Sequence, residues 1–295
     1  MNKTLCGYVA LIGRPNVGKS TLLNRILGQK ISITSCKPQT TRHQILGVKT
    51  AAHQQMIFVD TPGMHRNEVK AINRVMNRAA DSVLKTVDVI VWLVDQHWTA
   101  EEERIIQKLS QCKLPVILAV NKVDTVKDKK QLLPYLEQVA AKYDFVDVIP
   151  LSVKHGQQVD VLEKRLASFM PSMPFLFAED QVTDRTERFL AAEIIREKFM
   201  RFLGQELPYS VTVEIDLFKE NEDGLLNISA TILVERNSQK AMIIGKGGSK
   251  LKEIGREARL DMKRAFEQKV FLQLWVKVKS GWSDNERALK SLGYE

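Results

Sequence analysis

Short apolar runs alternate with helical stretches along the first half of the chain. Apolar residues recur at helical spacing between the runs, for example over residues 21–27 and 100–109. The runs themselves cover residues 8–12, 56–59, 89–94, 115–120 and 146–151. This alternation predicts an α/β domain with a mostly parallel sheet and helices on both faces. Ligands bind such sheets at the carboxyl ends of the strands, so the residues after each run are the first candidates for chemistry.

The pattern changes after the segment that begins at Pro171 and ends at Pro174. Beyond it the sequence predicts a long helix, two strands, two helices around a glycine-rich loop, a strand and a short last helix. The long helix is expected over 184–203, the strands over 211–217, 227–235 and 270–278, and the last helix from residue 284. This order predicts a second domain of the α+β class. We therefore expect a first domain over residues 1–170, a linker over 171–183 and a second domain over 184–295.

Composition excludes several classes of protein. The 295 residues are 44% hydrophobic and 27% charged, which is a globular composition and not a disordered one. No apolar run reaches the roughly 18 residues that a membrane-spanning helix needs. Three cysteines, Cys6, Cys36 and Cys112, fit neither a metal knuckle nor an even disulfide framework, which predicts a reducing cytoplasm. We expect no secretory signal, because the first residues lead directly into a glycine motif.

The segment after the first apolar run matches the phosphate-binding pattern GxxxxGK[ST], with a strand predicted before it and a helix after it. Its glycines allow backbone N–H groups to surround the β- and γ-phosphates of a nucleotide. Lys19 adds a positive charge, and the Ser20 hydroxyl can ligate Mg²⁺. The expected nucleotide contacts of this loop are Gly13, Arg14, Pro15, Asn16, Val17, Gly18, Lys19, Ser20 and Thr21.

A second motif, Asp60-Thr61-Pro62-Gly63, follows the next apolar run. Asp60 can hold Mg²⁺ through water, and the N–H of Gly63 can approach a γ-phosphate because no side chain obstructs it. An ordinary turn explains this tetrapeptide about as well when it is taken alone. We expect nucleotide contacts from these four residues and from Met64.

Two motifs after the last strands of the first domain predict the base. The carboxylate of Asp124, in Asn121-Lys122-Val123-Asp124, can accept hydrogen bonds from N1–H and the 2-amino group of guanine. Adenine offers neither donor, so the discrimination is on the order of 10⁴-fold. The next motif, Ser152-Val153-Lys154, can offer a backbone N–H to the guanine oxygen. Together the motifs predict GTP or GDP as the ligand, with Mg²⁺.

The order and spacing of these motifs resemble those of the Ras-like GTPases. The wording Gly-Arg-Pro-Asn-Val-Gly-Lys-Ser is similar to the branch that includes the TrmE, Era and Der families. The resemblance implies that residues 39–42 form the first switch. It further implies that Thr41, rather than Thr40, completes the Mg²⁺ ligands with Ser20 and Asp60.

One residue departs from the Ras pattern. Met64 stands where a glutamine would orient the attacking water, and a thioether cannot do so, which predicts slow intrinsic hydrolysis. In relatives that share Asn16, this residue helps to hold a K⁺ ion beside the β- and γ-phosphates, so the resemblance implies stimulation by K⁺. The expected catalytic residues are Lys19, Asn16, Thr41 and Gly63.

Positive charge is concentrated in one part of the second domain. The chain carries 44 Lys and Arg against 35 Asp and Glu, which gives a net charge of +9. Residues 176–235 hold 6 basic and 13 acidic side chains, whereas residues 236–279 hold 12 and 4, a net charge of +8. Such a segment is typical of a surface that binds phosphate backbones, although a solvated helix face has the same charge pattern.

A GxxG loop, residues 245–248, lies inside this basic segment between two predicted helices. Its glycines let the backbone approach a nucleic-acid strand, and the helix N-terminus after it favours phosphate. Ile243, Leu251 and Ile254 are expected to line an apolar groove for unstacked bases. Trp275 and Trp282 either stack on bases or pack. The expected RNA contacts are Ile243, Ile244, Gly245, Lys246, Gly247, Gly248, Lys250, Leu251, Lys252 and Ile254.

A Ras-like P-loop domain followed by a type II KH domain resembles the Era family of bacterial GTPases over essentially the whole chain. The stretches 183–198, 207–214 and 274–282 are similar to that family as well. The resemblance implies a GTP-hydrolysing switch that binds 16S rRNA near its 3′ end and assists maturation of the small (30S) ribosomal subunit. It also implies a cytoplasmic protein with peripheral association with the inner face of the cell membrane. We expect no stable oligomer.

Two other interpretations stay open at this point. The chain is alternatively an RNA-binding module in which the bound guanine nucleotide is mainly structural, and Met64 gives this some weight. A difference in RNA affinity between the GTP and GDP states separates it from a switch. A signalling GTPase of the membrane surface would need an amphipathic anchor or a lipidation site, and the sequence shows neither.

Overall fold

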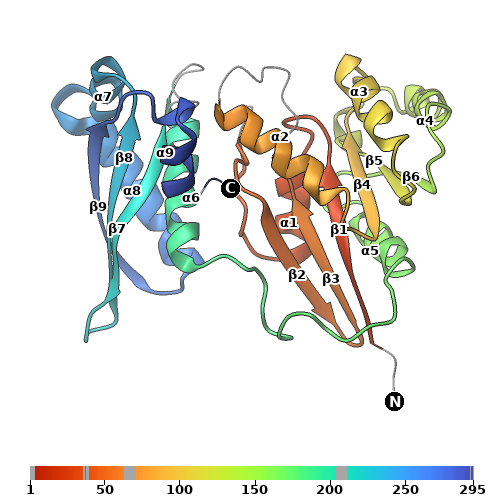
Figure 1. The fold of residues 1–295 in the computed structure, drawn as a ribbon, viewed down its shortest axis with the longest axis horizontal. Helices are drawn as coiled ribbons and strands as arrows, with labels where there is room; N and C mark the ends of the chain where they lie inside the picture. Colours follow the sequence, from red (N-terminus) through yellow and green to blue (C-terminus); the bar gives the residue numbers. More distant parts are fainter. Residues whose placement is uncertain are drawn as a thin grey trace. The chain divides into compact units, whose positions relative to one another are not determined.

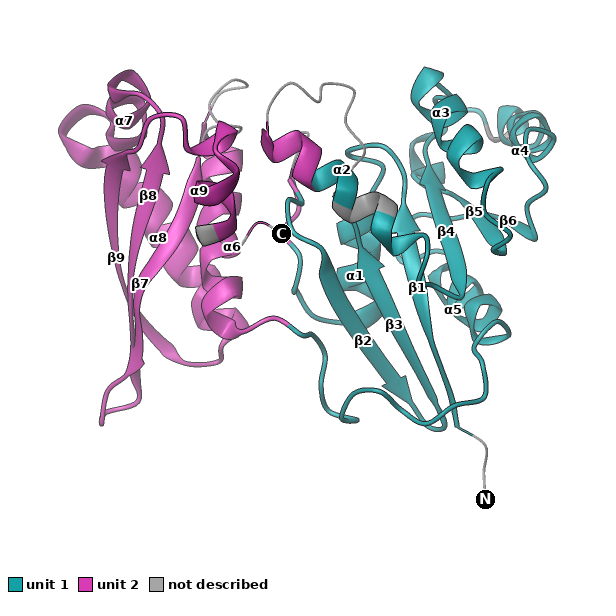
Figure 2. Ribbon diagram, viewed as in Figure 1, with its two compact units in different colours: residues 1–32, 41–66, 76–184 teal, residues 33–40, 67–75, 185–295 magenta. Residues whose placement is uncertain are grey.

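The computed structural model describes residues 4–35, 37, 40–62, 71–203, 211–292 and 294. It divides into two compact units (Figure 2). The first unit comprises residues 1–32, 41–66 and 76–184, and the second comprises residues 33–40, 67–75 and 185–295. The main division therefore falls between Asp184 and Arg185, while the domain limits expected from the sequence stay a prediction.

The first unit is built on a six-stranded sheet with the order β2-β3-β1-β4-β5-β6 (Figure 1). All neighbouring strands pair in parallel except β2, which is antiparallel to β3. The strands are β1 (Leu5–Ile12), β2 (Ile45–Ala51), β3 (Gln54–Asp60), β4 (Val89–Val94), β5 (Val116–Val120) and β6 (Asp147–Pro150). The mostly parallel sheet that the apolar runs predict is confirmed. The edge strand β2 was missed, because a glycine and a lysine interrupt its apolar pattern.

Helices cover both faces of this sheet, as predicted (Figure 1). One face forms a core with side chains from α2, α3 and α4, among them Val83, Ile105 and Val139. On the other face α1 contacts β2, β3 and α5. The helices are α1 (Lys19–Leu27), α2 (Ala71–Val83), α3 (Ala100–Leu109), α4 (Leu132–Ala140) and α5 (Val159–Ala167). Central strands such as β4 are buried on both faces, which is why they appear in the sequence as unbroken apolar runs.

Local chemistry fixes the ends of these elements. Helix α3 begins with a capping box. The Thr99 side chain accepts from the backbone N–H of Glu102, and the Glu102 carboxylate accepts from the backbone N–H of Thr99. On β2, a Cβ atom at Gly47 would lie 2.6 Å from a methyl carbon of Leu23, so the absence of a side chain lets α1 pack closely on the sheet.

The second unit has a three-stranded sheet with the order β7-β8-β9. Strands β7 (Thr212–Glu220) and β8 (Leu225–Val234) form an antiparallel hairpin, and β9 (Lys269–Val278) runs parallel to β8. Helices α6 (Glu187–Phe202) and α8 (Ser249–Ala265) bury one face of this sheet, and α7 (Asn237–Ile244) and α9 (Glu286–Ser291) complete the unit. The order α-β-β-α-α-β is that of a type II KH domain, as predicted.

Helix α6 carries an unusual set of buried charges. Glu193, Arg196, Glu197 and Lys198 are each at most 5% exposed. Arg196 pairs with Glu193 at 2.6 Å, and Lys198 pairs with Asp261 of α8. The carboxylate of Glu197 accepts from both the backbone N–H and the hydroxyl of Thr34, at 3.2 and 3.3 Å. Buried charges are retained only when they are paired in this way.

Residues 33–40 therefore belong to the second unit through contacts with α6, although they connect two stretches of the first. The guanidinium of Arg196 donates to the carbonyl oxygen of Thr40, and the ammonium group of Lys37 donates to the carbonyl oxygen of Leu203. The sequence gives no indication of these contacts, because the partners are more than 150 positions apart.

Candidate functional site

The loop between β1 and α1 follows a path that only glycine permits at two positions. Gly13 has φ 140° and Gly18 has φ 110°, both in the region that side chains disfavour. A Cβ atom would lie 2.3 Å from the backbone oxygen of Leu93 at Gly13, and 2.4 Å from Nδ2 of Asn121 at Gly18. The loop is thus held tightly against the ends of β4 and β5 and leads into the N-terminus of α1.

Lys19 places its positive charge inside this loop. Its Nζ donates to the carbonyl oxygens of Gly13 at 2.8 Å and Arg14 at 3.1 Å. The residue is 6% exposed. Burial lowers the pKa of Lys19 to about 8, against the opposing charge of Asp60. An anion placed in the loop would favour the charged form of this amine.

Oxygen atoms gather around the carboxylate of Asp60, at the carboxyl end of β3. Its Oδ2 accepts from the hydroxyls of Ser20 at 2.7 Å and Ser32 at 3.0 Å. The hydroxyl of Thr41 lies 2.8 Å from that of Ser20. Ser20, Thr41 and Asp60 are predicted from the sequence, whereas Ser32 is not, since a serine in a loop carries no distinguishing signal.

The Asp60 cluster has the composition of a site for a hard divalent cation. Asp60 is fully buried, and burial raises the pKa of its carboxyl although Lys19 and the surrounding hydroxyls oppose this. Its Oδ1 has no hydrogen-bond partner among the described residues. A buried carboxylate oxygen without a partner, in a cluster with the hydroxyls of Ser20, Ser32 and Thr41, fits Mg²⁺. The hydroxyl of Thr40 instead donates to the carbonyl oxygen of Lys37 at 2.6 Å.

Other residues of the two phosphate motifs have structural contacts. Thr61 is 2% exposed, and its hydroxyl donates to the carbonyl oxygen of Leu11 at 3.0 Å, which ties the end of β3 to β1. Val17 is fully buried. Their side chains are therefore not open to a ligand, and the expected nucleotide contacts of both residues, which backbone groups can make, stay a prediction. Gly63 and Met64 lie outside the described residues.

Asn121 joins the phosphate loop to the two base motifs. Its Nδ2 donates to the carbonyl oxygen of Val17 at 2.7 Å. Its Oδ1 accepts from the backbone N–H groups of Lys122 at 2.7 Å and Val153 at 3.0 Å. One buried side chain thus fixes three loops that come from the ends of β1, β5 and β6.

Asp124 is held in place by the neighbouring loop. The hydroxyl of Ser152 donates to its Oδ1 at 2.5 Å, and this hydrogen bond is the main cause that lowers the pKa of Asp124. Arg25 of α1 also holds the loop of residues 152–154 in place. Its guanidinium donates to the carbonyl oxygens of Val153 at 3.2 Å and Lys154 at 2.5 Å. Arg25 was not identified from the sequence, since a basic residue in the last turn of a helix is common.

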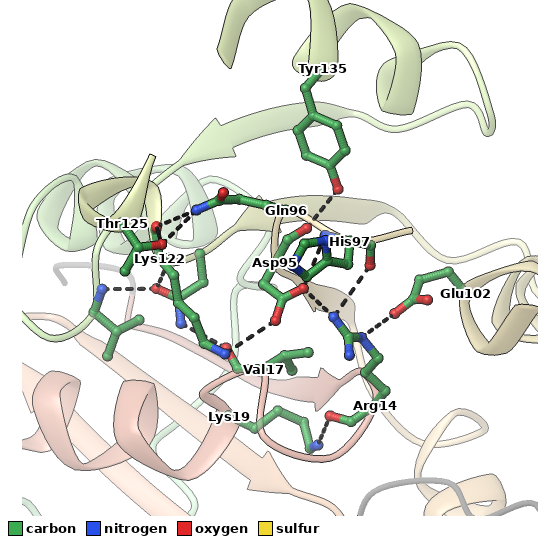
Figure 3. A network of polar contacts seen from close by, with 12 residues as sticks. Arg14, Val17, Lys19, Asp95, Gln96, His97, Glu102, Lys122, Thr125 and Tyr135 are labelled. Carbon is green, nitrogen blue, oxygen red and sulfur yellow. Dashed lines mark hydrogen bonds and ion pairs between the residues drawn. The ribbon is translucent and has the colours of Figure 1, made fainter. Parts of the chain in front are cut away.

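A network of charges connects the phosphate loop with the base loop (Figure 3). Asp95, which directly follows β4, pairs with Arg14 of the loop and with Lys122 at 3.1 Å. Arg14 also pairs with Glu102 of α3 at 2.8 Å. Burial raises the pKa of Asp95, but the N–H of His97 and the charges of Arg14 and Lys122 outweigh it, so this pKa is lowered. Asp95 was not predicted from the sequence, although its position directly after a strand is typical of residues at a ligand site.

The GxxG loop of the second unit is open to solvent. Gly245, Gly247 and Gly248 have φ of 73°, 60° and 77°, and a Cβ atom at Gly247 or Gly248 would meet nothing within 4 Å. Helix α8 starts directly after the loop, and its cap Gly248 provides no side-chain hydrogen bond. Backbone N–H groups at this helix N-terminus are therefore available to a phosphate.

The apolar residues expected to line a groove beside this loop lie in or against the core. Ile243 and Ile254 are fully buried in the core of the unit and Leu251 packs against that core, so the isoleucine side chains offer no open surface here, and their expected contact with bases stays a prediction. Their positions on α7 and α8 face the sheet. Trp282 is also buried, at 1%, beside Tyr294, whereas Trp275 on β9 is 63% exposed. Of the two tryptophans, only Trp275 is open to a stacked base.

Comparison with known proteins agrees with this arrangement. A family model described as 50S ribosome-binding GTPase matches residues 8–122, and a KH domain model matches residues 206–283. The chain is 58% identical to GTPase Era from Haemophilus influenzae over 294 residues, which is 99% of this chain and 97% of the relative. It is also 58% identical to GTPase Era from Yersinia pestis over 295 residues, 100% of this chain and 97% of that one.

Solved structures of similar proteins cover both units. A crystal structure of Aquifex aeolicus Era, a variant bound to GDP·AlF4⁻, matches with a TM-score of 0.95 at 38% identity. A crystal structure of Era in complex with MgGDPNP and nucleotides 1506–1542 of 16S ribosomal RNA matches with the same TM-score and identity. Each match covers 99% of both chains.

Proposed function

Since the chain belongs to the Era family and is a GTPase, we propose that it uses GTP to control capture of the 3′ segment of 16S rRNA and so assists small-subunit maturation. The observation that carries this proposal is that residues 33–40 contact α6 of the second unit. The flanking residues Ser32 and Thr41 belong to the Asp60 cluster. One short segment is thus joined along the chain to residues of the proposed Mg²⁺ site and contacts a helix of the unit that is proposed to bind RNA.

The phosphate loop and the Asp60 cluster are proposed to bind Mg²⁺ and the phosphates of GTP. Lys19 supplies charge from within the loop, and Ser20, Thr41 and Asp60 supply the hydroxyl and carboxylate oxygens. The metal, when bound, neutralises charge on the β- and γ-phosphate oxygens. A solved Era structure contains MgGDPNP, which supports this assignment.

Asp124 is proposed to read guanine, with Ser152 holding its carboxylate in position. The N–H of Val153 already donates to Asn121, so the neighbouring N–H of Lys154 is the better candidate for the guanine oxygen. The sequence motif alone does not distinguish these two backbone donors.

The lowered pKa of Lys19 makes nucleotide affinity depend on pH. The charged amine binds phosphate, and its fraction falls as the pH rises through about 8. Between pH 7.5 and 8.5 the affinity for GDP should therefore fall about threefold. Titration calorimetry at several pH values measures this. The matched control is Lys19→Arg, because arginine stays charged over this range and its profile should be flat, whatever its absolute affinity. A wild-type profile as flat as that of the control contradicts the assignment.

Hydrolysis is proposed to be slow without help and to be stimulated by K⁺. The carboxamide oxygen of Asn16 is a hard ligand on an exposed loop residue, with φ 67°, and this composition fits a K⁺ ion. Met64 offers no group that orients water.

The expected result is a kcat on the order of tenfold higher in K⁺ than in Na⁺ at the same ionic strength. In Asn16→Ala this difference should disappear. Steady-state phosphate release measures both. Equal kcat values in the two salts for the wild type would sink the K⁺ proposal, without touching the assignment of the nucleotide site.

The GxxG loop and α8 are proposed to hold the RNA. The loop is open, lies at a helix N-terminus and is surrounded by Lys246, Lys250 and Lys252. The solved complex with nucleotides 1506–1542 of 16S rRNA supports this choice of partner. Peripheral association with the cell membrane stays a prediction from the family resemblance. No helix among the described residues has both the length and the apolar character to cross a bilayer.

The role in maturation is tested in cells depleted of this protein. Small subunits with unprocessed 16S rRNA should accumulate, and the wild-type chain should restore processing. A chain that cannot bind RNA should fail to do so. Normal processing in depleted cells contradicts the maturation role and leaves GTP hydrolysis and RNA binding to be judged by themselves.

A further inference from the structure

A cavity of about 360 Å³ opens at the C-terminal end of α8, at the opposite end of this helix from the GxxG loop. Three basic and three apolar side chains line it, namely Arg259, Lys263, Lys269, Leu225, Leu260 and Val270. The basic residues come from α8 and the start of β9, and all three are exposed. Within the part of the chain that the structure describes, none of the three has a charge partner.

The lining points to an occupant with one anionic and one apolar part. Three cations around one hollow repel each other, and a bound phosphate removes this repulsion. Of its apolar lining, Leu260 is 38% exposed and Val270 is 5% exposed. A bare phosphate would leave the apolar lining exposed to water. A nucleotide would also cover this lining, with its base. The volume lies within the range of about 300–1,000 Å³ that small-ligand sites have.

A line of positive charge connects the GxxG loop to this cavity. Lys252, Arg256, Arg259 and Lys263 follow one another at intervals of four, three and four residues, which places them on one side of α8. This stripe is about 16 Å long at 1.5 Å per residue. Arg256 has a nearby carboxylate, Glu257 at 3.2 Å, but its own side chain is 67% exposed. A polyanion that leaves the loop would be drawn along the stripe.

We propose that this cavity is a second RNA site, which binds one unstacked nucleotide beyond the four that a KH loop clamps. The phosphate lies between Arg259, Lys263 and Lys269, and the base lies on Leu260 and its apolar neighbours. This proposal rests on the proposed RNA-binding function and extends it along α8.

The charge part is tested with the double variant Lys263→Gln/Lys269→Gln. The probe is an RNA of 16S nucleotides 1506–1542, titrated at several salt concentrations. The variant should bind about tenfold more weakly, and its salt slope should fall by about 0.7, since one phosphate contact on a single strand contributes about that much. The matched control is Arg287→Gln/Lys290→Gln, which removes two exposed charges from α9 and should bind within twofold of the wild type. A double variant that behaves like this control overturns the proposal.

The apolar part is tested with Leu260→Gln. Leu260 is exposed, so this substitution leaves the packing of the core unchanged. Affinity for the same RNA should fall about fivefold with an unchanged salt slope, because apolar contact with a base is lost and no charge is removed. Wild-type affinity in this variant, together with a loss in the double variant, would leave a simple phosphate contact and overturn the nucleotide site.

Two further arms separate the possible sources of the nucleotide and the possible reasons for failure. Adenosine 5′-monophosphate alone should bind in the cavity with no better than millimolar affinity, as followed by NMR of the Leu225 and Leu260 methyl groups. Micromolar binding would assign the cavity to a free nucleotide. If the wild type does not bind the RNA, the proposed function and this site both fail. If Gly248→Asp loses the RNA while the cavity variants retain it, the second site alone fails.

Discussion

Replacing Asp124 by asparagine should lower the affinity for GTP by about 10³- to 10⁴-fold and raise the affinity for xanthosine triphosphate. The carboxylate is the group that accepts from N1–H and the 2-amino group of guanine in this account. An amide presents a donor in place of one acceptor, which suits the 2-oxo group of xanthine. The change is nearly isosteric, so the loop that Ser152 and Asn121 hold together should keep its shape.

Fluorescent guanine and xanthine nucleotides measure both affinities in one assay. Ser152→Ala is the matched control, because it removes the hydroxyl at 2.5 Å from the carboxylate and leaves the carboxylate itself. It should lose about 10- to 100-fold in GTP affinity, as one hydrogen bond to a charged group contributes, and should gain no preference for xanthine. Full GTP affinity in Asp124→Asn contradicts the assignment of the base contact.

Gly248→Asp should reduce RNA affinity at least about 100-fold while GTP hydrolysis without RNA stays near the wild-type rate. Gly248 has φ 77°, which aspartate tolerates better than most residues, and its Cβ would enter open space. A carboxylate at the N-terminus of α8 favours the helix. The fold is therefore preserved, and the new negative charge stands where the RNA phosphate is expected to bind.

Gly248→Asn is the control for this change, since it has the same shape and the same backbone preference without the charge. It should retain RNA binding to within several-fold. Filter binding with the 16S segment and thermal unfolding of both variants are the measurements. Equal RNA affinities for the two variants and the wild type would remove the GxxG loop from the interface.

The order of the motifs made the nucleotide site predictable from the sequence. Ser20, Asp60, Asn121 and Ser152 follow different strands of one parallel sheet, and such strands bring their carboxyl ends together. Once the apolar runs are recognised as strands, the convergence of these residues follows without coordinates. The burial of the Thr61 side chain could not be predicted, because a motif does not show where a side chain points.

What the sequence could not predict depends on contacts between distant residues. Arg25 supports the loop at Val153 across 128 positions, and Glu197 holds Thr34 across 163. Each is an ordinary charged residue on a helix until its partner is known. The burial of Ile243 and Ile254 could not be predicted for another reason, because an apolar residue beside a GxxG loop has the same spacing whether it faces the core or a groove.

The contacts of residues 33–40 with α6 are the reason to expect that the nucleotide controls RNA capture. Thr41, in the Asp60 cluster, directly follows Thr40, whose carbonyl oxygen accepts from Arg196. A γ-phosphate that repositions Thr41 therefore changes the segment that α6 binds. A ligand shifts a conformational equilibrium only as far as it binds the two states differently.

The most direct measurement is the affinity for an RNA of 16S nucleotides 1506–1542, with GDP and with a non-hydrolysable GTP analogue, at one stated salt concentration. We expect binding about tenfold tighter with the analogue, which corresponds to a coupling of about 1.4 kcal/mol. Equal affinity in the two states would contradict it, and the guanine nucleotide would then be a structural ligand of an RNA-binding protein.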